Sequence, residues 1–488
     1  MDEIAFSSAS ALVESIRRGK LKSVELVDHY LRRIEQLDGP INAVVTRVAE
    51  AARARARELD DHLLKDGPVG PLHGLPMTIK DAHETAGIRT TGGAPELRDH
   101  VPTENSVAVQ RLLDAGVIIL GKTNVPLYSS DLQTFNELFG TTHNPHDTTR
   151  TPGGSSGGAA ASLACGFTGL ELGSDIGGSI RTPAHWTGVF GHKPSYGIVP
   201  GRGHIPGPPG TLSEPDLAVI GPLARSAEDL ELALEVVAGP DAARARAYSL
   251  QLPPPRHARV QDFRVAAWLD DPACPVDGAV REQLERAVQA LRDAGAHVDT
   301  EARPDFTLSE VASLYFRLLH PIMVSGMPKP VLDMLATVAA DESEAQRGTE
   351  LHTLAKNATA THLSWLRADE RRCRYRARMG AFFERYDVLL SPVNPVVAIP
   401  HDQEGNQVTR RISVDGQERP YSDLMAWISL ATACGLPATV APVGRTEAGL
   451  PVGAQLVGPL LEDRTPIALA GHLERLLGGF VPPAAFSE

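Results

Sequence analysis

The sequence contains little cysteine, and this scarcity excludes two classes of protein. Its 488 residues include four cysteines, Cys165, Cys274, Cys373 and Cys434, far apart and without a Cys-x-x-Cys pair. A small disulfide-stapled fold needs paired cysteines at short spacings, and a structural zinc site needs clustered thiolates or imidazoles. We therefore expect neither a disulfide framework nor a zinc site.

An excess of basic residues and a long apolar run are also missing. Lys and Arg number 47 against 60 Asp and Glu, which gives a formal net charge of −13. Nucleic-acid surfaces need clustered basic side chains, and a membrane helix needs about 20 consecutive apolar residues. The first residues, Met1 to Ile4, lack the basic and apolar regions of a signal peptide. We expect no nucleic-acid partner, no membrane partner and a cytoplasmic location.

The composition that is present, 42% hydrophobic and 22% charged, is typical of a globular protein with a large core. Helix-like and strand-like patterns alternate from about residue 70 onward, which predicts an α/β fold. With no internal repeat and no clear linker, we expect one compact domain over residues 1–488, with a glycine-rich core at 70–240. Helices over 8–37 and 43–65 should wrap this domain. A helical insertion over 305–385 is a candidate cover for a substrate pocket.

Two glycine-serine segments stand out, one at 153–158 and one at 173–181. Between them, residues 159–165 are small and uncharged, which predicts a buried helix. Glycine allows backbone N–H groups to turn toward a single oxygen atom. The pattern predicts a pocket in which two rigid loops hold serine hydroxyls.

Three other interpretations of these segments compete with this one. A flexible linker is disfavoured because the buried helix follows at once. A phosphate-binding loop would end in Gly-Lys-Ser/Thr, whereas Gly157 and Gly158 are followed by alanine. Residues 153–157 fit the Gly-x-Ser-x-Gly nucleophile elbow of α/β-hydrolases, which would make Ser155 the nucleophile. Its partners would be His472 with either Asp423 or Asp463, but this leaves residues 175–181 unexplained.

Lys80 ends a short apolar strand predicted at 74–81. A serine hydroxyl is a poor nucleophile until a base removes its proton, and a lysine with a pKa of about 10.4 cannot accept it in water. Burial disfavours the ammonium ion and lowers that pKa. Lys80 is therefore a candidate base, the alternative being a surface lysine whose stem covers apolar atoms.

Together these residues resemble the amidase signature family of serine hydrolases. Three motifs match the family in order and spacing: Lys80-Asp81 after a short strand, Gly-Gly-Ser-Ser-Gly-Gly at 153–158, and Asp-Ile-Gly-Gly-Ser-Ile-Arg at 175–181. The match is dense over 70–239 and looser over 387–458. The resemblance implies a central mixed β-sheet flanked by helices.

The resemblance also implies the catalytic roles. Ser179 would be the nucleophile, Ser155 a bridging serine that follows a cis peptide bond, and Lys80 the terminal base. The oxyanion hole would be formed by the backbone N–H groups of Ile176, Gly177, Gly178 and Ser179.

Further family positions would support the two loops or bind substrate. Ser156, Asp175 and Arg181 would hold the loops in place. Ser129 and Ser130 would line the substrate pocket, and the neighbouring Tyr128, Asp131 and Gln133 would add to it. His143 and His146 could suggest a metal site, but no third or fourth ligand accompanies them. We expect neither a metal nor a cofactor.

The expected activity is that of an amidase, a hydrolase acting on linear amide C–N bonds. It would convert acyl or aryl amides to carboxylate and amine through a Ser179 acyl-enzyme, with esters and carbamates as side substrates. The expected partner is a small-molecule amide, and a homodimer is left open.

Some family members are instead the glutaminase subunit of a tRNA-dependent amidotransferase, and this is the alternative function. Such subunits carry an aspartate ten residues before a Gly-Leu-Pro segment, where it binds the amino group of glutamine. Counting back from Gly435 reaches Met425, and Asp423 is out of step. This departure favours an acyl group without an ammonium.

Overall fold

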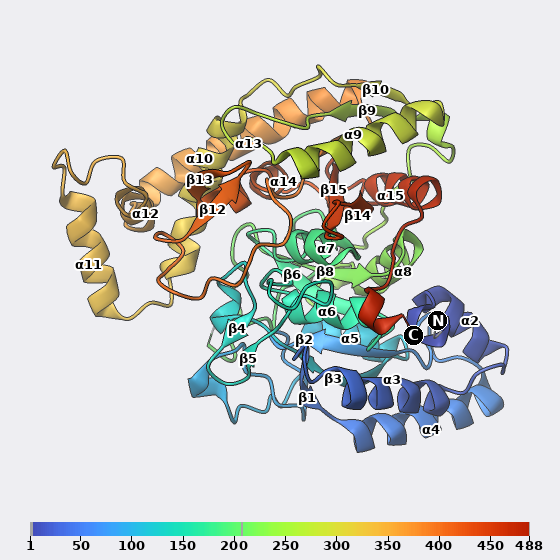
Figure 1. Cartoon of the computed structure of the whole chain (residues 1–488). Coiled ribbons are helices and arrows are strands. Elements are labelled where there is room, and N and C mark those ends of the chain that lie inside the picture. The colour runs from blue at the N-terminus through green and yellow to red at the C-terminus, as the bar shows by residue number, and fades with distance from the viewer. Residues whose placement is uncertain (1–2, 206–207, 488) are drawn as a thin grey trace.

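The computed structural model describes residues 3–205 and 208–487. Its centre is an eleven-stranded sheet with the strand order β1-β3-β2-β6-β8-β7-β14-β15-β11-β9-β10 (Figure 1). The strands of this sheet are β1 Val44–Arg47, β2 Pro76–Lys80, β3 Ile118–Thr123, β6 Glu171–Asp175, β7 Phe190–Lys193, β8 Val219–Ala224, β9 Arg264–Ala267, β10 His297–Asp299, β11 Val388–Pro392, β14 Ala438–Arg445 and β15 Pro451–Val457. Two small hairpins are separate: β4 Phe135–Asn136 with β5 Gly140–Thr141, and β12 Arg411–Val414 with β13 Gln417–Pro420.

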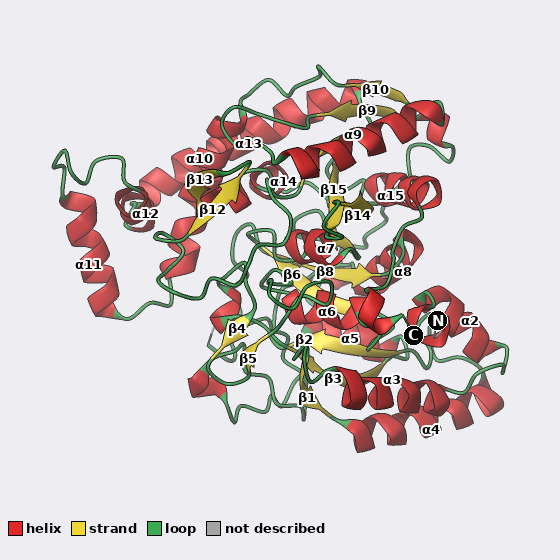
Figure 2. Cartoon of the chain, in the orientation of Figure 1, coloured by secondary structure: helices red, strands yellow, loops and turns green. Residues whose placement is uncertain are grey.

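The sheet is mixed. Strand β2 pairs in parallel with β3 and β6, whereas β6 with β8 and β14 with β15 are antiparallel. Most of its strands are buried along their whole length, because helices cover both faces (Figure 2). The predicted α/β fold with a mixed central sheet flanked by helices is confirmed.

The helices are α1 Glu3–Phe6, α2 Ala9–Arg17, α3 Ser23–Leu37, α4 Ala49–Asp66, α5 Val107–Asp114, α6 Gly157–Ala164, α7 Arg181–Thr187, α8 Ala227–Val237, α9 Gly278–Asp293, α10 Leu308–Val324, α11 Lys329–Ala340, α12 Glu350–Ala358, α13 His362–Arg385, α14 Ser429–Cys434 and α15 Arg464–Leu477. Helices α3 and α4 lie beneath the β1 end of the sheet (Figure 1). Helix α3 buries residues at helical spacing there, among them Leu26, Val27, Tyr30 and Ile34. In the described residues, no helix is both long and apolar enough to cross a membrane.

One sequence-based expectation about local structure is wrong. The helix expected over 43–65 begins only at Ala49, because Val44–Arg47 forms β1 and pairs with β3. Here tertiary pairing, which local composition does not encode, decides the backbone conformation.

Residues 305–385 are largely helical, and their role as a pocket cover stays a prediction. Helices α10 and α13 lie across α14, and α11 projects from the body of the molecule (Figure 1). The uncharged helix α6 and the short helix α7 pack against each other in the buried centre. The two glycine-serine segments lead directly into these helices, so the central packing sets where their serines lie.

Candidate active site

The parallel pairing of β2 and β6 brings the ends of both strands to the same edge of the sheet. Lys80 is the last residue of β2, and Ser174 lies near the end of β6. The Lys80 side chain is fully buried, and Nζ lies 2.6 Å from Ser155 Oγ and 2.9 Å from Ser174 Oγ. The apolar strand therefore delivers its lysine to a serine of the first glycine loop.

Burial controls the charge of this lysine. It lowers the pKa of Lys80 from 10.5 to about 7, although Asp175 and Glu171 act in the opposite direction. A neighbouring lysine, Lys122 on β3, is equally buried, but its Nζ donates to the His83 carbonyl and to two threonine hydroxyls. Lys80 is thus the buried lysine whose contacts suit a base acting on serine.

Ser155 follows a cis peptide bond from Gly154, as the resemblance implies. Gly154 lies against the backbone of residues 131–133, where a Cβ would come within 2.6 Å of Asp131 O and 2.7 Å of Gln133 N. Only glycine fits such a close backbone approach. The loop that carries Ser155 is therefore fixed from two sides, by Lys80 and by the 131–133 segment.

Ser179 lies on the second loop, at the start of α7, and is 5% exposed. Ser156 N donates to Ser179 O at 3.2 Å, which joins the two loops. No hydrogen bond connects the hydroxyls of Ser155 and Ser179 in the described residues. Catalytic hydrogen bonds are often long without substrate and tighten in the reacting complex. The Ser156 hydroxyl lies 3.4 Å from Ser174 O, beside the same junction.

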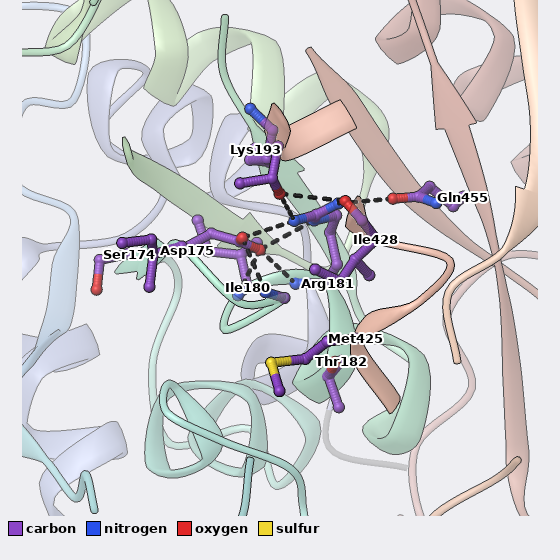
Figure 3. Close-up of polar contacts among 12 residues, drawn as sticks. Ser174, Asp175, Ile180, Arg181, Thr182, Lys193, Met425, Ile428 and Gln455 are labelled. Atoms are coloured by element: carbon purple, nitrogen blue, oxygen red, sulfur yellow. Dashed lines mark hydrogen bonds and ion pairs between the residues drawn. The ribbon is translucent and has the colours of Figure 1, made fainter. Parts of the chain in front are cut away.

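Asp175 and Arg181 form a buried ion pair that holds the second loop (Figure 3). The guanidinium donates to both carboxylate oxygens, at 2.7 and 3.0 Å, and also to Gln455 and to Ile428 O. Burial alone would raise the Asp175 pKa, but the Arg181 charge and hydrogen bonds outweigh it and lower this pKa to about 2. The Asp175 carboxyl therefore stays ionised at neutral pH beside the Arg181 guanidinium, and the supporting role of the two residues stays a prediction.

The same carboxylate also contacts the expected oxyanion hole. Gly178 N donates to Asp175 Oδ1 at 3.0 Å, so this N–H is engaged within the loop. The described contacts assign no acceptor to the N–H groups of Ile176, Gly177 and Ser179, which makes these three the freer candidate donors. The role of all four N–H groups, Gly178 included, stays a prediction.

An apolar and a phenolic side chain cover the second loop. A Cβ added to Gly177 would lie 3.4 Å from Tyr315 Oη and 3.5 Å from Met425 Sδ. Tyr315 comes from α10 and donates to Ile176 O at 3.0 Å. Met425 ends the 3₁₀ helix η5, Tyr421–Met425, and lies close to the loop that carries Ser179 (Figure 3).

Comparison with known proteins identifies the family. The family model described as Amidase matches residues 25–466. The chain belongs to the amidase family. It is 32% identical to a glutamyl-tRNA(Gln) amidotransferase subunit of Moorella thermoacetica, over 97% of each chain. The corresponding subunit of Synechococcus sp. is also 32% identical, over 96% of this chain and 95% of its own.

The chain is also similar to solved structures that are not described as amidotransferase subunits. A bacterial aryl acylamidase of the amidase signature family is 27% identical, with a TM-score of 0.80 over 97% of each chain. A chain of a vestigial complex related to the origins of an s-triazine catabolic enzyme is 28% identical. Its TM-score is 0.79, over 97% of this chain and 99% of that chain. The chain is therefore similar both to amidotransferase subunits and to an aryl acylamidase.

The segment suggested for substrate binding in this amidase-family chain lies beside Gly154. The Ser130 hydroxyl is exposed and donates to Leu127 O at 2.7 Å, and Ser129 Oγ is buried without a partner among the described residues. Asp131 is held by Arg410 at 2.6 Å and by the Tyr421 hydroxyl at 2.9 Å. The segment is thus linked through Tyr421 to the 3₁₀ helix η5, which ends at Met425. The role of Ser129 and Ser130 stays a prediction.

Three residues near the site have no role assigned from the sequence. Ser174 contacts Lys80, His204 contacts Ser174, and Tyr315 covers the second loop. Ser174 lies inside the second glycine-serine segment, and His204 lies in the Gly/Pro-rich stretch 201–215, so position alone could have suggested both. Tyr315 comes from a remote helix, and no local signal marks it.

The residues of the rival interpretations lie elsewhere. His143 Nδ1 lies 3.1 Å from His401 Nε2, whereas His146 contacts Thr187 O, so the two histidines do not form one site. No group of three or more metal-ligating side chains is found within residues 3–205 and 208–487. Asp463 accepts from His192 and Ser195, and Asp423 pairs with Arg419. Neither carboxylate accepts from His472, so the α/β-hydrolase alternative gains no support.

Proposed function

We propose that the chain hydrolyses carboxamide C–N bonds through an acyl-enzyme on Ser179. The observation that carries this proposal is the buried contact of 2.6 Å between Lys80 Nζ and Ser155 Oγ on adjoining elements of the site. Neutral Lys80 takes the Ser155 proton while Ser155 takes that of Ser179, whose Oγ attacks the carbonyl carbon. This relay requires the Ser179 hydroxyl to come within hydrogen-bond distance of Ser155 in the reacting complex.

The rest of the cycle uses the same groups. Backbone N–H groups of Ile176, Gly177 and Ser179 stabilise the oxyanion, and the proton held by Lys80 returns through Ser155 to the leaving amine. The C–N bond then breaks and leaves an ester on Ser179. Water, deprotonated by the same relay, adds to that ester and releases the carboxylate.

For the acyl group, the site favours an uncharged substituent. Met425 and Tyr315 cover Gly177, and the nearby carboxylate of Asp423 is paired with Arg419 at 2.7 Å. An unpaired ammonium would lose its hydration against such a surface without gaining a counter-charge. We therefore propose small acyl or aryl amides as substrates, with esters and carbamates as side substrates.

The second candidate is the glutaminase subunit of an amidotransferase. The curated relatives named above support this alternative better than free amide hydrolysis, because they carry that function at 32% identity over nearly the whole chain. Both functions share the hydrolysis of an amide at Ser179, and they differ in substrate and in the need for partner subunits. A homodimer and a cytoplasmic location stay predictions.

One set of assays tests both candidates. The purified chain should hydrolyse amides and anilides without ATP or added subunits, and a fluorophosphonate should label Ser179, as located by peptide mass spectrometry. Ser179→Ala should abolish turnover and labelling. Turnover of glutamine alone, and only with added subunits, would favour the amidotransferase, whereas labelling of Ser155 would contradict the Ser179 mechanism.

A further inference from the structure

His204 lies on a loop whose backbone is fixed next to β2. Glu84 N donates to Gly203 O at 2.9 Å, and His83 and His204 form an antiparallel bridge. Gly203 has a φ of 84°, and a Cβ there would lie 2.6 Å from the Cα of Ser106, so the loop needs glycine at this point. The imidazole of His204 is thus placed by its own loop, independently of the two glycine-serine segments.

This imidazole ends a chain of hydrogen bonds that begins at the bridging serine. Ser155 Oγ lies 2.6 Å from Lys80 Nζ, Lys80 Nζ lies 2.9 Å from Ser174 Oγ, and Ser174 Oγ lies 2.8 Å from His204 Nε2. In Figure 3 the Ser174 hydroxyl points away from the Asp175–Arg181 ion pair. The chain of hydrogen bonds therefore runs on the opposite side of β6 from the Asp175–Arg181 pair, which holds the second loop.

Counting the protons shows in which direction these hydrogen bonds must be donated for Lys80 to act as a base. The neutral amine of Lys80 has two N–H bonds and one lone pair, and only the lone pair can accept the Ser155 proton. Ser174 has one O–H. If that O–H points to Nε2 of His204, the Ser174 oxygen accepts from Lys80 and the lone pair faces Ser155. If it points to Lys80 instead, the lone pair is occupied and the base is blocked.

We propose that His204 is a positioning residue that accepts the Ser174 O–H and thereby reserves the Lys80 lone pair for the Ser155 proton. This inference rests on the proposed function, because it concerns the activation of Ser179 through Lys80. His204 touches no reacting atom and acts through Ser174.

The surroundings of His204 suit an acceptor. The ionisable groups that face it are His83, whose ring centroid is 4.9 Å away, Lys80 on β2 and Lys122 on β3. Burial, together with the charges of the two lysines, lowers the pKa of His204 to about 3. The imidazole is therefore neutral across the pH range in which Lys80 titrates, and with its proton on Nδ1 it presents a free Nε2 lone pair.

The test measures the rate at which a fluorophosphonate labels Ser179, since this rate needs no knowledge of the natural substrate. His204→Leu removes the acceptor and should slow labelling by about tenfold or more, within the ~10²–10⁴-fold that a positioned base supplies. His204→Gln places an amide oxygen near Nε2 and should keep most of the rate. His146→Gln, which replaces a partly buried histidine outside this chain of hydrogen bonds, is the control and should leave the rate unchanged.

The pH profile separates positioning from loss of structure. In His204→Leu the Ser174 O–H turns to the Lys80 lone pair, which favours the neutral amine. The apparent pKa of labelling should therefore fall together with the plateau rate. A loosened site that admits water would move the pKa up toward 10.5, the ordinary lysine value. That upward shift, or equal losses in His204→Leu and His204→Gln, would overturn the proposal.

A double substitution gives a second, independent outcome. If His204 acts through Ser174, His204→Leu should add nothing to the loss caused by Ser174→Ala. Additive losses would overturn the inference even if each single variant is slow. Failure of the proposed function is distinguishable, because the wild-type protein would then leave Ser179 unlabelled at every pH.

Discussion

The Lys80 amine lies 2.6 Å from the Ser155 hydroxyl, and both side chains are almost completely buried. A lysine in that environment is useful to a serine only when it is neutral. The site produces this state by placing Lys80 at the end of an apolar strand, where the cost of burying an ammonium lowers its pKa to about 7. The proposed chemistry follows from this one contact.

The first prediction concerns the pH dependence of hydrolysis. Because the base must be unprotonated, kcat/KM should rise with pH through an apparent pKa near 7 and level off above it. Stopped assays of an amide substrate between about pH 5 and pH 10 would measure this profile. A rate that is flat across that range would show that Lys80 does not titrate in the rate-limiting step.

The second prediction concerns stability. The folded pKa of Lys80 is depressed from 10.5 to about 7, so the unfolded chain binds more protons between these values and stability rises with pH there. The penalty is complete below pH 7, where the folded state carries a buried charge. Lys80→Met should raise the free energy of unfolding by a few kcal/mol at about pH 6, since a pKa change of one corresponds to about 1.4 kcal/mol.

This gain should shrink as the pH approaches about 10, as measured by urea unfolding at several pH values. Lys122→Met is the matched control, because burial lowers the pKa of that lysine to about 8 without any contact to Ser155. It should show the same trend in stability but keep Ser179 labelling. A gain from Lys80→Met that does not change with pH would mean that packing rather than charge explains it.

The third prediction concerns the ion pair beneath the second loop. Arg181→Met leaves the Asp175 carboxylate buried without its partner and should cost about 3–5 kcal/mol and most of the activity. Arg53→Met, which breaks the solvent-accessible pairs of Arg53 with Asp28 and Glu50, should cost far less because water screens those pairs. Chemical denaturation measures both values, and a similar small loss in each would contradict the supporting role of Arg181.

Acid unfolding should report the same pair. The Asp175 pKa is about 2 in the folded chain against an ordinary 3.8, so its contribution is present above pH 3.8 and is lost as the pH falls toward 2. In Asp175→Asn this part of the acid-induced loss should be absent.

The fourth prediction concerns substrate choice. Met425→Asp would place a carboxylate near Gly177, where an amino group on the acyl chain could pair with it. The ratio of glutamine to apolar amide turnover should rise by about tenfold or more, equal to about 1.4 kcal/mol of differential binding. Met425→Leu, of similar volume, should keep the original preference. An unchanged ratio in Met425→Asp would remove this position from the acyl pocket.

Much of the fold and part of the site could be predicted from the sequence. Glycine and serine spacing marks the loops at 153–158 and 173–181, and the apolar run before Lys80 marks its strand. These signals are local, since each depends on the residue types of one short segment. The mixed sheet and the cis bond before Ser155 follow from the resemblance to a family and not from local patterns.

The remaining features depend on contacts between distant segments. Tyr315 reaches Ile176 from a helix that is remote in the sequence, and Val44–Arg47 forms a strand because β3 offers a pairing edge. The commitment of Gly178 N to Asp175 depends on the turn of one loop, which residue types alone do not determine. Such contacts become visible only once the chain is folded.

The most direct test of the central claim compares two substrates in one variant. Lys80→Ala leaves the backbone N–H groups of Ile176, Gly177 and Ser179 in place, so a slow reaction with activated esters should persist. Amides should lose far more activity, because their amine leaving group must be protonated by the relay, whereas a phenoxide leaves unaided. The account predicts a kcat/KM loss at least about tenfold larger for an anilide than for the matching phenyl ester. An equal loss on both substrates would contradict the role of Lys80 as the base.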